Sequence, residues 1–217
     1  MNKIFFFLFS FISLGVIAQG SAGVYKMRWR IDKRLTTGFQ MEIAGQGTTQ
    51  DYNRFRMSDY MRDLVVDEAL STLDYLLNSK TELVYRKRKN GNSITTYSSQ
   101  ESVGGLPRCT KRKAIQEFEQ DLYVRVYINV GSYKTTVFGL LGNGAYRIRP
   151  IVTVKIKAFG PDRRKVYKKR VRLSDFEKLN SVSYNIGNTT VTNSQTLNSE
   201  EIKDMVLKAL QQMTSLE

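Results

Sequence analysis

The chain has 217 residues, and its 34 Lys and Arg outnumber its 20 Asp and Glu, so the formal net charge at pH 7 is +14. It has no histidine and one cysteine, which excludes Ser-His-Asp and Cys-His catalysis, Cys-rich metal sites and an internal disulfide. We therefore expect no metal, no cofactor and no enzymatic activity, although two carboxylates alone would suffice for a glycosidase.

The first 19 residues have the features of a secretory signal peptide. Lys3 precedes an apolar run from Ile4 to Ala18, which is shorter than the roughly 18 to 20 residues needed to cross a bilayer. We predict that residues 1–19 are cleaved, with an uncleaved anchor or a buried N-terminal helix as alternatives. Because no cysteine stands directly after this segment, where Gln19, Gly20 and Ser21 lie, no lipid anchor is expected. A periplasmic, outer-membrane-associated or extracellular location follows, with one domain over residues 20–217.

Strict alternation predicts two strands after the signal segment. Apolar and charged residues alternate in "VYKMRWRID", residues 24–32, and the pattern returns in "FQMEI", residues 39–43. We expect the two strands to pair as a hairpin. The predicted buried face of the first strand comprises Tyr25, Met27, Trp29 and Ile31.

Residues 57–80 change to a helical period, with Ser58 as the expected N-cap. The predicted apolar face comprises Met61, Leu64, Val65, Ala69, Leu73, Leu76 and Leu77. A strand is expected over "ELVYRKRK", residues 82–89, with "SITTYS", residues 93–98, returning after an Asn-Gly turn.

Residues 110–217 are predicted to form a short helix, a group of strands and a terminal helix. Thr110 is the expected cap of the short helix, and "DLYVRVYINV", residues 121–130, and "YRIRPIVTVKIKAF", residues 146–159, alternate as strands. Asn198 and Glu201 form a capping-box pattern that begins the last amphipathic helix. These elements predict an α+β fold: a two-layer sandwich in which two main helices pack on one face of a mixed or mainly antiparallel sheet.

The decapeptide "RRKVYKKRVR", residues 163–172, follows a Gly-Pro-Asp turn and is expected to be the second arm of a hairpin. Alternation points Lys168, Arg170 and Arg172 to one face. We favour a solvated strand that blocks edge aggregation, with an electrostatic docking face as the second interpretation. The candidate anion- or partner-binding residues are Arg163, Arg164, Lys168, Lys169, Arg170 and Arg172, with further contributions from 86–89 and 111–113.

An apolar cluster lies in a glycine-containing connection between two strands. The nearby "GLLGNGAYR" lacks the Gly-Lys-Ser/Thr ending of a phosphate-binding loop. We favour a short buried strand, and the functional alternative is an exposed tip that docks a partner or touches a membrane surface. The candidate docking residues are Val137, Phe138, Leu140 and Leu141.

The order of elements over residues 120–217 resembles that of periplasmic accessory domains. The resemblance is carried by "DLYVRVYINV", by the hairpin "IVTVKIKAFGPDRRKVYKKRV", and by "TLNSEEIKDMVLKALQQM". Such domains include auxiliary lipoproteins of envelope transport systems, the N-terminal domain of the TolB type and the curli-secretion lipoprotein. The resemblance implies a non-catalytic envelope adaptor, and it assigns no site residues.

Basic residues interleaved with aromatics, as in "YKMRWR" and "VYRKRK", would favour nucleic-acid binding in a cytosolic protein. Because we expect export, we predict no nucleic-acid partner. Two hypotheses remain. The first is an envelope adaptor that binds protein partners, and the second is a module for anionic polymers or lipids, such as lipopolysaccharide, acidic polysaccharide or a membrane surface.

Overall fold

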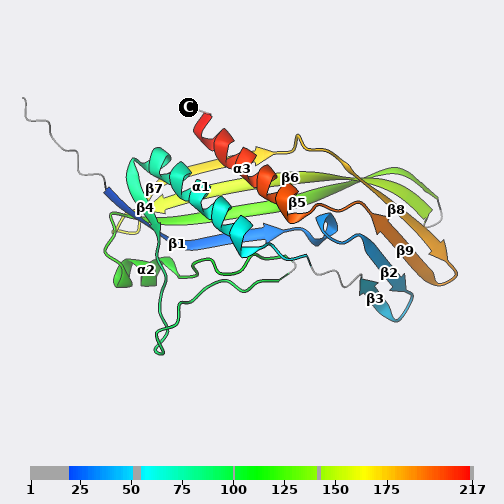
Figure 1. The fold of residues 1–217 in the computed structure, drawn as a ribbon, viewed down its shortest axis with the longest axis horizontal. Helices are drawn as coiled ribbons and strands as arrows, with labels where there is room; N and C mark the ends of the chain where they lie inside the picture. The colour runs from blue at the N-terminus through cyan, green and yellow to red at the C-terminus, as the bar shows by residue number, and fades with distance from the viewer. Residues whose placement is uncertain (1–19, 51–54, 100, 141–142, 216–217) are drawn as a thin grey trace, which may run out of the picture.

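The computed structural model describes residues 20–50, 55–99, 101–140 and 143–215. They form a curled mixed sheet of nine strands together with three α-helices (Figure 1). The predicted α+β class is therefore confirmed. The predicted signal peptide, residues 1–19, lies outside the described residues.

The sheet is organised around the long β5–β6 hairpin. The strand order is β3-β2-β9-β8-β6-β5-β1-β4, and β7 also pairs with β6. β1 runs parallel to both β4 and β5, whereas the other pairs are antiparallel. β6 pairs with β8 near its start and with β7 near its end. The strands are β1 Gly20–Ile31, β2 Phe39–Ile43, β3 Gly47–Gln50, β4 Ser79–Leu83, β5 Leu122–Leu140, β6 Asn143–Phe159, β7 Lys165–Leu173, β8 Leu179–Ile186 and β9 Thr189–Ser194.

The helices begin at the predicted caps. The Ser58 and Thr110 hydroxyls accept hydrogen bonds from the backbone N–H groups three residues later, at 3.3 and 3.4 Å. Asn198 and Glu201 exchange two hydrogen bonds, of 2.7 and 2.9 Å, which complete a capping box. The helices are α1 Asp59–Leu77, α2 Lys111–Glu117 and α3 Ser199–Ser215, and the short 3-10 helix η1 spans Lys33–Leu35.

The main core lies between the sheet and two of these helices. α1 and α3 contact each other on one side of the sheet, and α3 contacts β5, β6 and β7 (Figure 1). Alternate residues of the strands point into this core, and Ile202, Val206 and Leu210 of α3 are fully buried against them. Among the described helices, none combines the length and apolar character needed to cross a membrane.

The predicted hairpin between residues 24–32 and 39–43 is wrong. β1 is paired on both sides, with β5 along one edge and with β4 and residues 101–109 along the other. No edge of β1 is left for β2. η1 instead leads the chain away, and β2 pairs with β3 and β9.

Tyr25 is buried as predicted, but on the opposite face from Met27 and Trp29. The β1–β5 register shifts between Val24 and Lys26, and such a bulge reverses the side of the residue it contains. Tyr25 therefore joins a second, smaller cluster with Val84, Cys109, Ala114 and Tyr123. Burial raises the pKa of the Tyr25 hydroxyl to about 12.

Two further predictions need correction. Leu64 was placed on the buried face of α1 but is 38% exposed. Of the strands predicted over 82–89 and 93–98, only residues 82–83 lie in a strand, at the end of β4. Isolated pairing surrounds the Asn90-Gly91 turn, where Gly91 has φ +82° and the Arg88 N–H donates to the Asn92 carbonyl at 2.8 Å. The turn is therefore as predicted, whereas the strands beside it are irregular because residues 101–109 take the adjacent place next to β1.

Replacing Leu210 by Ala should lower the free energy of unfolding by about 2–5 kcal/mol, because this fully buried side chain joins α3 to the sheet. Chemical denaturation followed by circular dichroism measures the change. Gln211→Ala is the matched control on the exposed side of the same turn and should be nearly neutral. Equal losses in the two variants would show that α3 is not held by its apolar face.

Candidate anion-binding face and adjoining pocket

The sheet face opposite α1 and α3 carries a regular array of cations. Residues that alternate with the core positions of β1, β5, β6 and β7 share this outer side, and strand register aligns them in three rows. We call the twelve positions the basic face. The first row is Lys26, Arg125, Lys157 and Lys168; the second is Arg28, Tyr127, Lys155 and Arg170; the third is Arg30, Asn129, Thr153 and Arg172.

The spacing within this array follows from strand geometry. Neighbouring strands lie about 5 Å apart, and residues two apart along one strand are separated by about 7 Å. The first row is entirely cationic, the second has three cations and the third has two. No Asp or Glu occupies any of the twelve positions, so the face presents positive charge in both directions.

The pKa of Lys157 reflects the concentration of positive charge on the basic face. It is lowered chiefly by the charge of Lys155, with smaller contributions from desolvation and from Arg125, Lys168 and Lys165. A neighbouring cation disfavours the ammonium form and so lowers the pKa of a lysine. The surroundings of Lys157 are therefore positive enough to change its titration, although its side chain reaches solvent.

Within the described chain, the cations of the basic face form no ion pairs. Cations elsewhere do: Arg62 contacts Asp59 and Asp63 at 2.7 and 2.8 Å, and Arg86 contacts Glu117 at 2.8 Å. On the face, Arg125 instead lies over the ring of Tyr127, with 5.1 Å between the guanidinium carbon and the ring centroid. The face is thus left with charge that no carboxylate of the described residues neutralises.

The structure places half of the predicted anion-binding residues on this face. Lys168, Arg170 and Arg172 belong to its three rows, whereas Lys169 alternates to the other side of β7. Arg163 and Arg164 lie in the turn before β7, and Arg164 pairs with Asp162 at 3.4 Å.

Six cations of the face were missed by sequence reasoning. Each alternates with apolar neighbours in its own strand, so the sequence contains a signal. That signal could not show that four distant strands would align their charged sides, because strand pairing is not visible in local alternation. The missed residues are Lys26, Arg28, Arg30, Arg125, Lys155 and Lys157.

The second predicted site, at the end of β5, is a strand but not a buried one. Val137 and Phe138 are 57% and 66% exposed, because the sheet extends past the ends of α1 and α3 and no helix covers it there (Figure 1). Leu140 ends β5, and Leu141 lies outside the described residues.

Phe138 belongs to an exposed apolar row. Its register partner Ala145 pairs with Val182, which is 50% exposed, and the row continues through Asn193 to Phe39, which is 37% exposed. We call Phe39, Val182 and Phe138 the apolar row. It lies on the same side of the sheet as the basic face, because Ala145 shares its side of β6 with Lys155.

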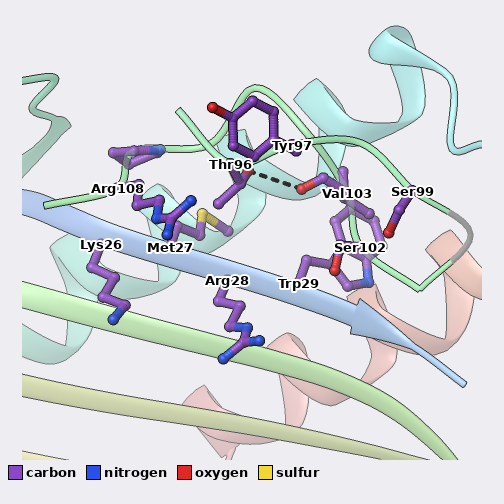
Figure 2. A pocket seen from close by; sticks show the side chains of 11 residues that line it. Lys26, Met27, Arg28, Trp29, Thr96, Tyr97, Ser99, Ser102, Val103 and Arg108 are labelled. Carbon is purple, nitrogen blue, oxygen red and sulfur yellow. Dashed lines mark hydrogen bonds between the residues drawn. The ribbon is translucent and has the colours of Figure 1, made fainter. Parts of the chain in front are cut away.

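A pocket of about 320 Å³ adjoins the basic face at β1 (Figure 2). Lys26 and Arg28 of the face line it, and Tyr97 and Arg108 lie across β1 from them. The apolar part of the lining is Met27, Trp29, Val103 and Pro107, and the polar part is completed by Thr96, Ser99 and Ser102. Among the described residues, no carboxylate lines this pocket.

A bulge shapes the wall of the pocket. The Met27 N–H donates to Pro107 at 3.0 Å and the Val103 N–H donates to Trp29 at 3.1 Å, so residues 103–107 lie opposite a shorter stretch of β1. The extra residues include Gly104 and Gly105, and Gly105 has φ +79°, a left-handed conformation that favours glycine. The Thr96 hydroxyl closes the bulge by donating to Val103 at 2.9 Å and accepting from Leu106 at 3.1 Å.

Comparison with solved structures shows distant similarities, which include the two described below. No protein-family model and no curated protein matches the chain. A neuraminyllactose-binding hemagglutinin homolog from Helicobacter pylori has 10% identity and a TM-score of 0.38, over 93% of this chain and 84% of that one. The hypothetical protein CT253 from Chlamydia trachomatis has 12% identity and a TM-score of 0.31, over 71% and 72%. Neither value supports a functional argument, so function is inferred from the site itself.

Replacing Lys155 by Gln should raise the pKa of Lys157 toward its ordinary value, because it removes the largest charge that disfavours the Lys157 ammonium. The titration of the lysine side-chain carbons by NMR measures this pKa. Lys87→Gln, on the exposed arm beside the Asn-Gly turn, is the control and should leave it unchanged. An unaltered Lys157 pKa in both variants would contradict the positive field described for the face.

Proposed function

We propose that this protein binds anionic polymers of the cell envelope, foremost acidic polysaccharide, through its basic face. The observation that carries the proposal is the alignment, on four adjacent strands, of Lys and Arg that form no ion pair with any described residue. A linear polymer with an anionic group on each unit can contact several of these cations at once. Its affinity then falls as salt rises, because bound counterions and screening compete with the contacts.

Solubility alone explains the array poorly. A soluble surface is served equally well by interspersed charges of both signs. Here Lys157 is directly opposite Lys168, and Lys155 is opposite Arg170. Like charges in directly opposed strand positions destabilise a sheet, by roughly 0.2–1 kcal/mol for each such pair. An arrangement that costs stability and serves no packing purpose is typical of a binding surface.

The chemistry of the face favours a polysaccharide over a single-stranded nucleic acid. Non-specific binding of single strands uses exposed aromatic rings on which bases stack. The aromatic residue of the basic face, Tyr127, is half-buried and lies beneath Arg125. Asn129 and Thr153 supply amide and hydroxyl groups between the charges, and such groups suit the hydroxyls of a sugar chain.

The expected export of the protein and the accessibility of the basic face also support the proposal. The N-terminal signal segment would deliver the protein to the envelope, where acidic polysaccharides and lipid headgroups are the available polyanions. Because α1 and α3 pack on the opposite side of the sheet, the rows of the basic face are accessible to a long ligand. The resemblance of residues 120–217 to periplasmic accessory domains is in accord with this location.

An adaptor that binds protein partners is the second candidate function. It is favoured by the apolar row and by the exposure of Val137, because exposed apolar side chains gathered in one place are typical of interaction sites. This region lies at the helix-free end of the sheet, away from the decapeptide strand (Figure 1). The two functions would use different parts of one face and are separable by mutation.

The variant with Lys155, Lys157 and Arg170 all changed to Gln should bind polygalacturonate about 100-fold more weakly. We base this on roughly 1 kcal/mol for each exposed cation near an anionic surface. Isothermal titration at several salt concentrations gives the affinity, and the slope of log K against log salt should become shallower by about two to three.

The matched control changes Lys87, Arg88 and Lys89 to Gln. It removes the same charge from the exposed arm and should have little effect on affinity. Parallel titrations use random-sequence duplex DNA and vesicles that contain anionic lipid. Tighter binding to either of these than to polygalacturonate at equal salt, or equal losses in both triple variants, would overturn the polysaccharide proposal.

The double variant Phe138→Ser with Val182→Ser should lose protein partners that withstand high salt, because it removes the two most exposed apolar side chains of the apolar row. Tagged protein is crosslinked briefly in its native cells, washed at high salt, and the captured proteins are identified by mass spectrometry. Tyr75→Ser is the control, because Tyr75 is 61% exposed on α1. Capture of the same proteins by the double variant would count against the adaptor function.

A further inference from the structure

The pocket beside β1 has a cationic rim and an apolar floor. Arg28, Arg108 and the partly exposed Lys26 form the charged part of the lining. Like the cations of the basic face, Arg108 has no ion pair among the described residues. With no carboxylate in the lining, the pocket selects for an anionic ligand over a neutral or cationic one.

The floor and one wall are suited to a ring. Trp29 and Met27 are fully buried beneath the pocket, together with Val103 and Pro107. Tyr97, which is 70% exposed, provides an aromatic ring at the rim (Figure 2). Hydroxyls of Ser99 and Ser102 complete the lining. Apolar surface, an aromatic ring and hydroxyls together match a sugar ring, which has apolar C–H faces and a polar edge.

The volume and position of the pocket suit one sugar unit of a polysaccharide that lies across the basic face. Its volume, about 320 Å³, is at the small end of the range for ligand pockets. It does not stand apart from the basic face, because Lys26 and Arg28 belong to the face and also line the pocket. A polymer lying across the rows can therefore place one unit in the pocket without leaving the face.

The walls are held in place before any ligand binds. Backbone hydrogen bonds tie residues 101–109 to β1, and the Thr96 hydroxyl bridges the two sides of the Gly104-Gly105 bulge. A site that is already formed loses little affinity to reorganisation. Tyr97 and Arg108 project beside this fixed segment: Arg108 lies directly opposite Lys26, next to the first row of the basic face, and Tyr97 lies outside the rows.

We infer that this pocket is a subsite for one acidic sugar unit, whose carboxylate or sulfate is bound by Arg108 and Arg28 and whose ring packs beside Tyr97. The inference rests on the proposed binding of acidic polysaccharide and names the unit that the protein recognises. The basic face supplies affinity that depends little on the identity of the polymer. The pocket supplies selectivity for a charged sugar.

The position of tryptophan allows a direct test. The chain has one tryptophan, and Trp29 lines the pocket, so its fluorescence serves as the reporter of binding there. The full protein is titrated at constant ionic strength with galacturonic acid, with glucose 6-sulfate and with neutral glucose. At least one of the acidic sugars should give a saturable change in emission with a millimolar Kd, whereas glucose should give none.

Variants distinguish this inference from the proposed function. Arg108→Gln should weaken binding of the acidic sugar at least about tenfold, and Tyr97→Ala should also weaken it. Both side chains are exposed, so the thermal unfolding midpoint should not change. The nine cations of the basic face remain in both variants, so polygalacturonate should lose no more than about fivefold in affinity, the effect of a single cation.

The results of these titrations distinguish the proposed subsite from the proposed binding of polysaccharide by the basic face. If polygalacturonate binds but neither acidic sugar changes Trp29 emission, the subsite is overturned and the basic face stands. If an acidic sugar binds equally well to the Arg108→Gln and Tyr97→Ala variants, the pocket is likewise excluded as its site. If acidic sugars bind in the pocket while polygalacturonate does not bind, the polymer function fails and the pocket serves a free acidic sugar.

Discussion

The two-residue alternation of β1, β5, β6 and β7 is the constraint on which the rest of the molecule depends. In each strand one set of side chains fills the core beneath α1 and α3, and the other set carries the cations. A slip of one residue in any of these pairings would exchange the two sets, which would bury Lys and Arg and expose Val and Ile. The core thereby fixes the register, and the register fixes the basic face. Repulsion between neighbouring cations opposes the arrangement, but burial of the opposite side outweighs it.

Local patterns predicted the elements well where a single segment contained the whole signal. The caps Ser58, Thr110 and Asn198 were read from residues within one turn of each helix, and the Gly-Pro-Asp turn between β6 and β7 is equally local. The failures concern pairing at long range. Nothing in residues 24–43 indicates that β1 is flanked on both sides by later parts of the chain, so a hairpin with β2 was the natural expectation. The bulge that turns Tyr25 to the other face also depends on β5, a hundred residues away.

The candidate site was predictable to the same extent. The decapeptide was visible as a charge run, and alternation correctly separated Lys168 and Arg170 from the core side of their strand. Its partners Lys155 and Lys157 are spaced by apolar residues and form no run, so composition did not single them out. The pocket could not be predicted from the sequence. Its lining combines β1 with an irregular segment, residues 96–108, and the Gly-Gly-Leu-Pro stretch in that segment predicted only the end of an element. Distance along the chain, rather than weak local signals, limited what the sequence could reveal.

The central place of β1 also has a consequence for how the protein folds. β1 is the first strand of the chain, yet its neighbour β5 begins at Leu122, so Ala22 meets its partner a hundred residues later. Contacts of such long sequence separation pay a large loop-closure cost before they contribute stability, which slows folding. An emerging N-terminal segment cannot complete its sheet until β5 is present, and its core remains open until α3 arrives at the end of the chain. The long pairing of β1 with β5 therefore makes completion of the core and of the basic face a late step of folding.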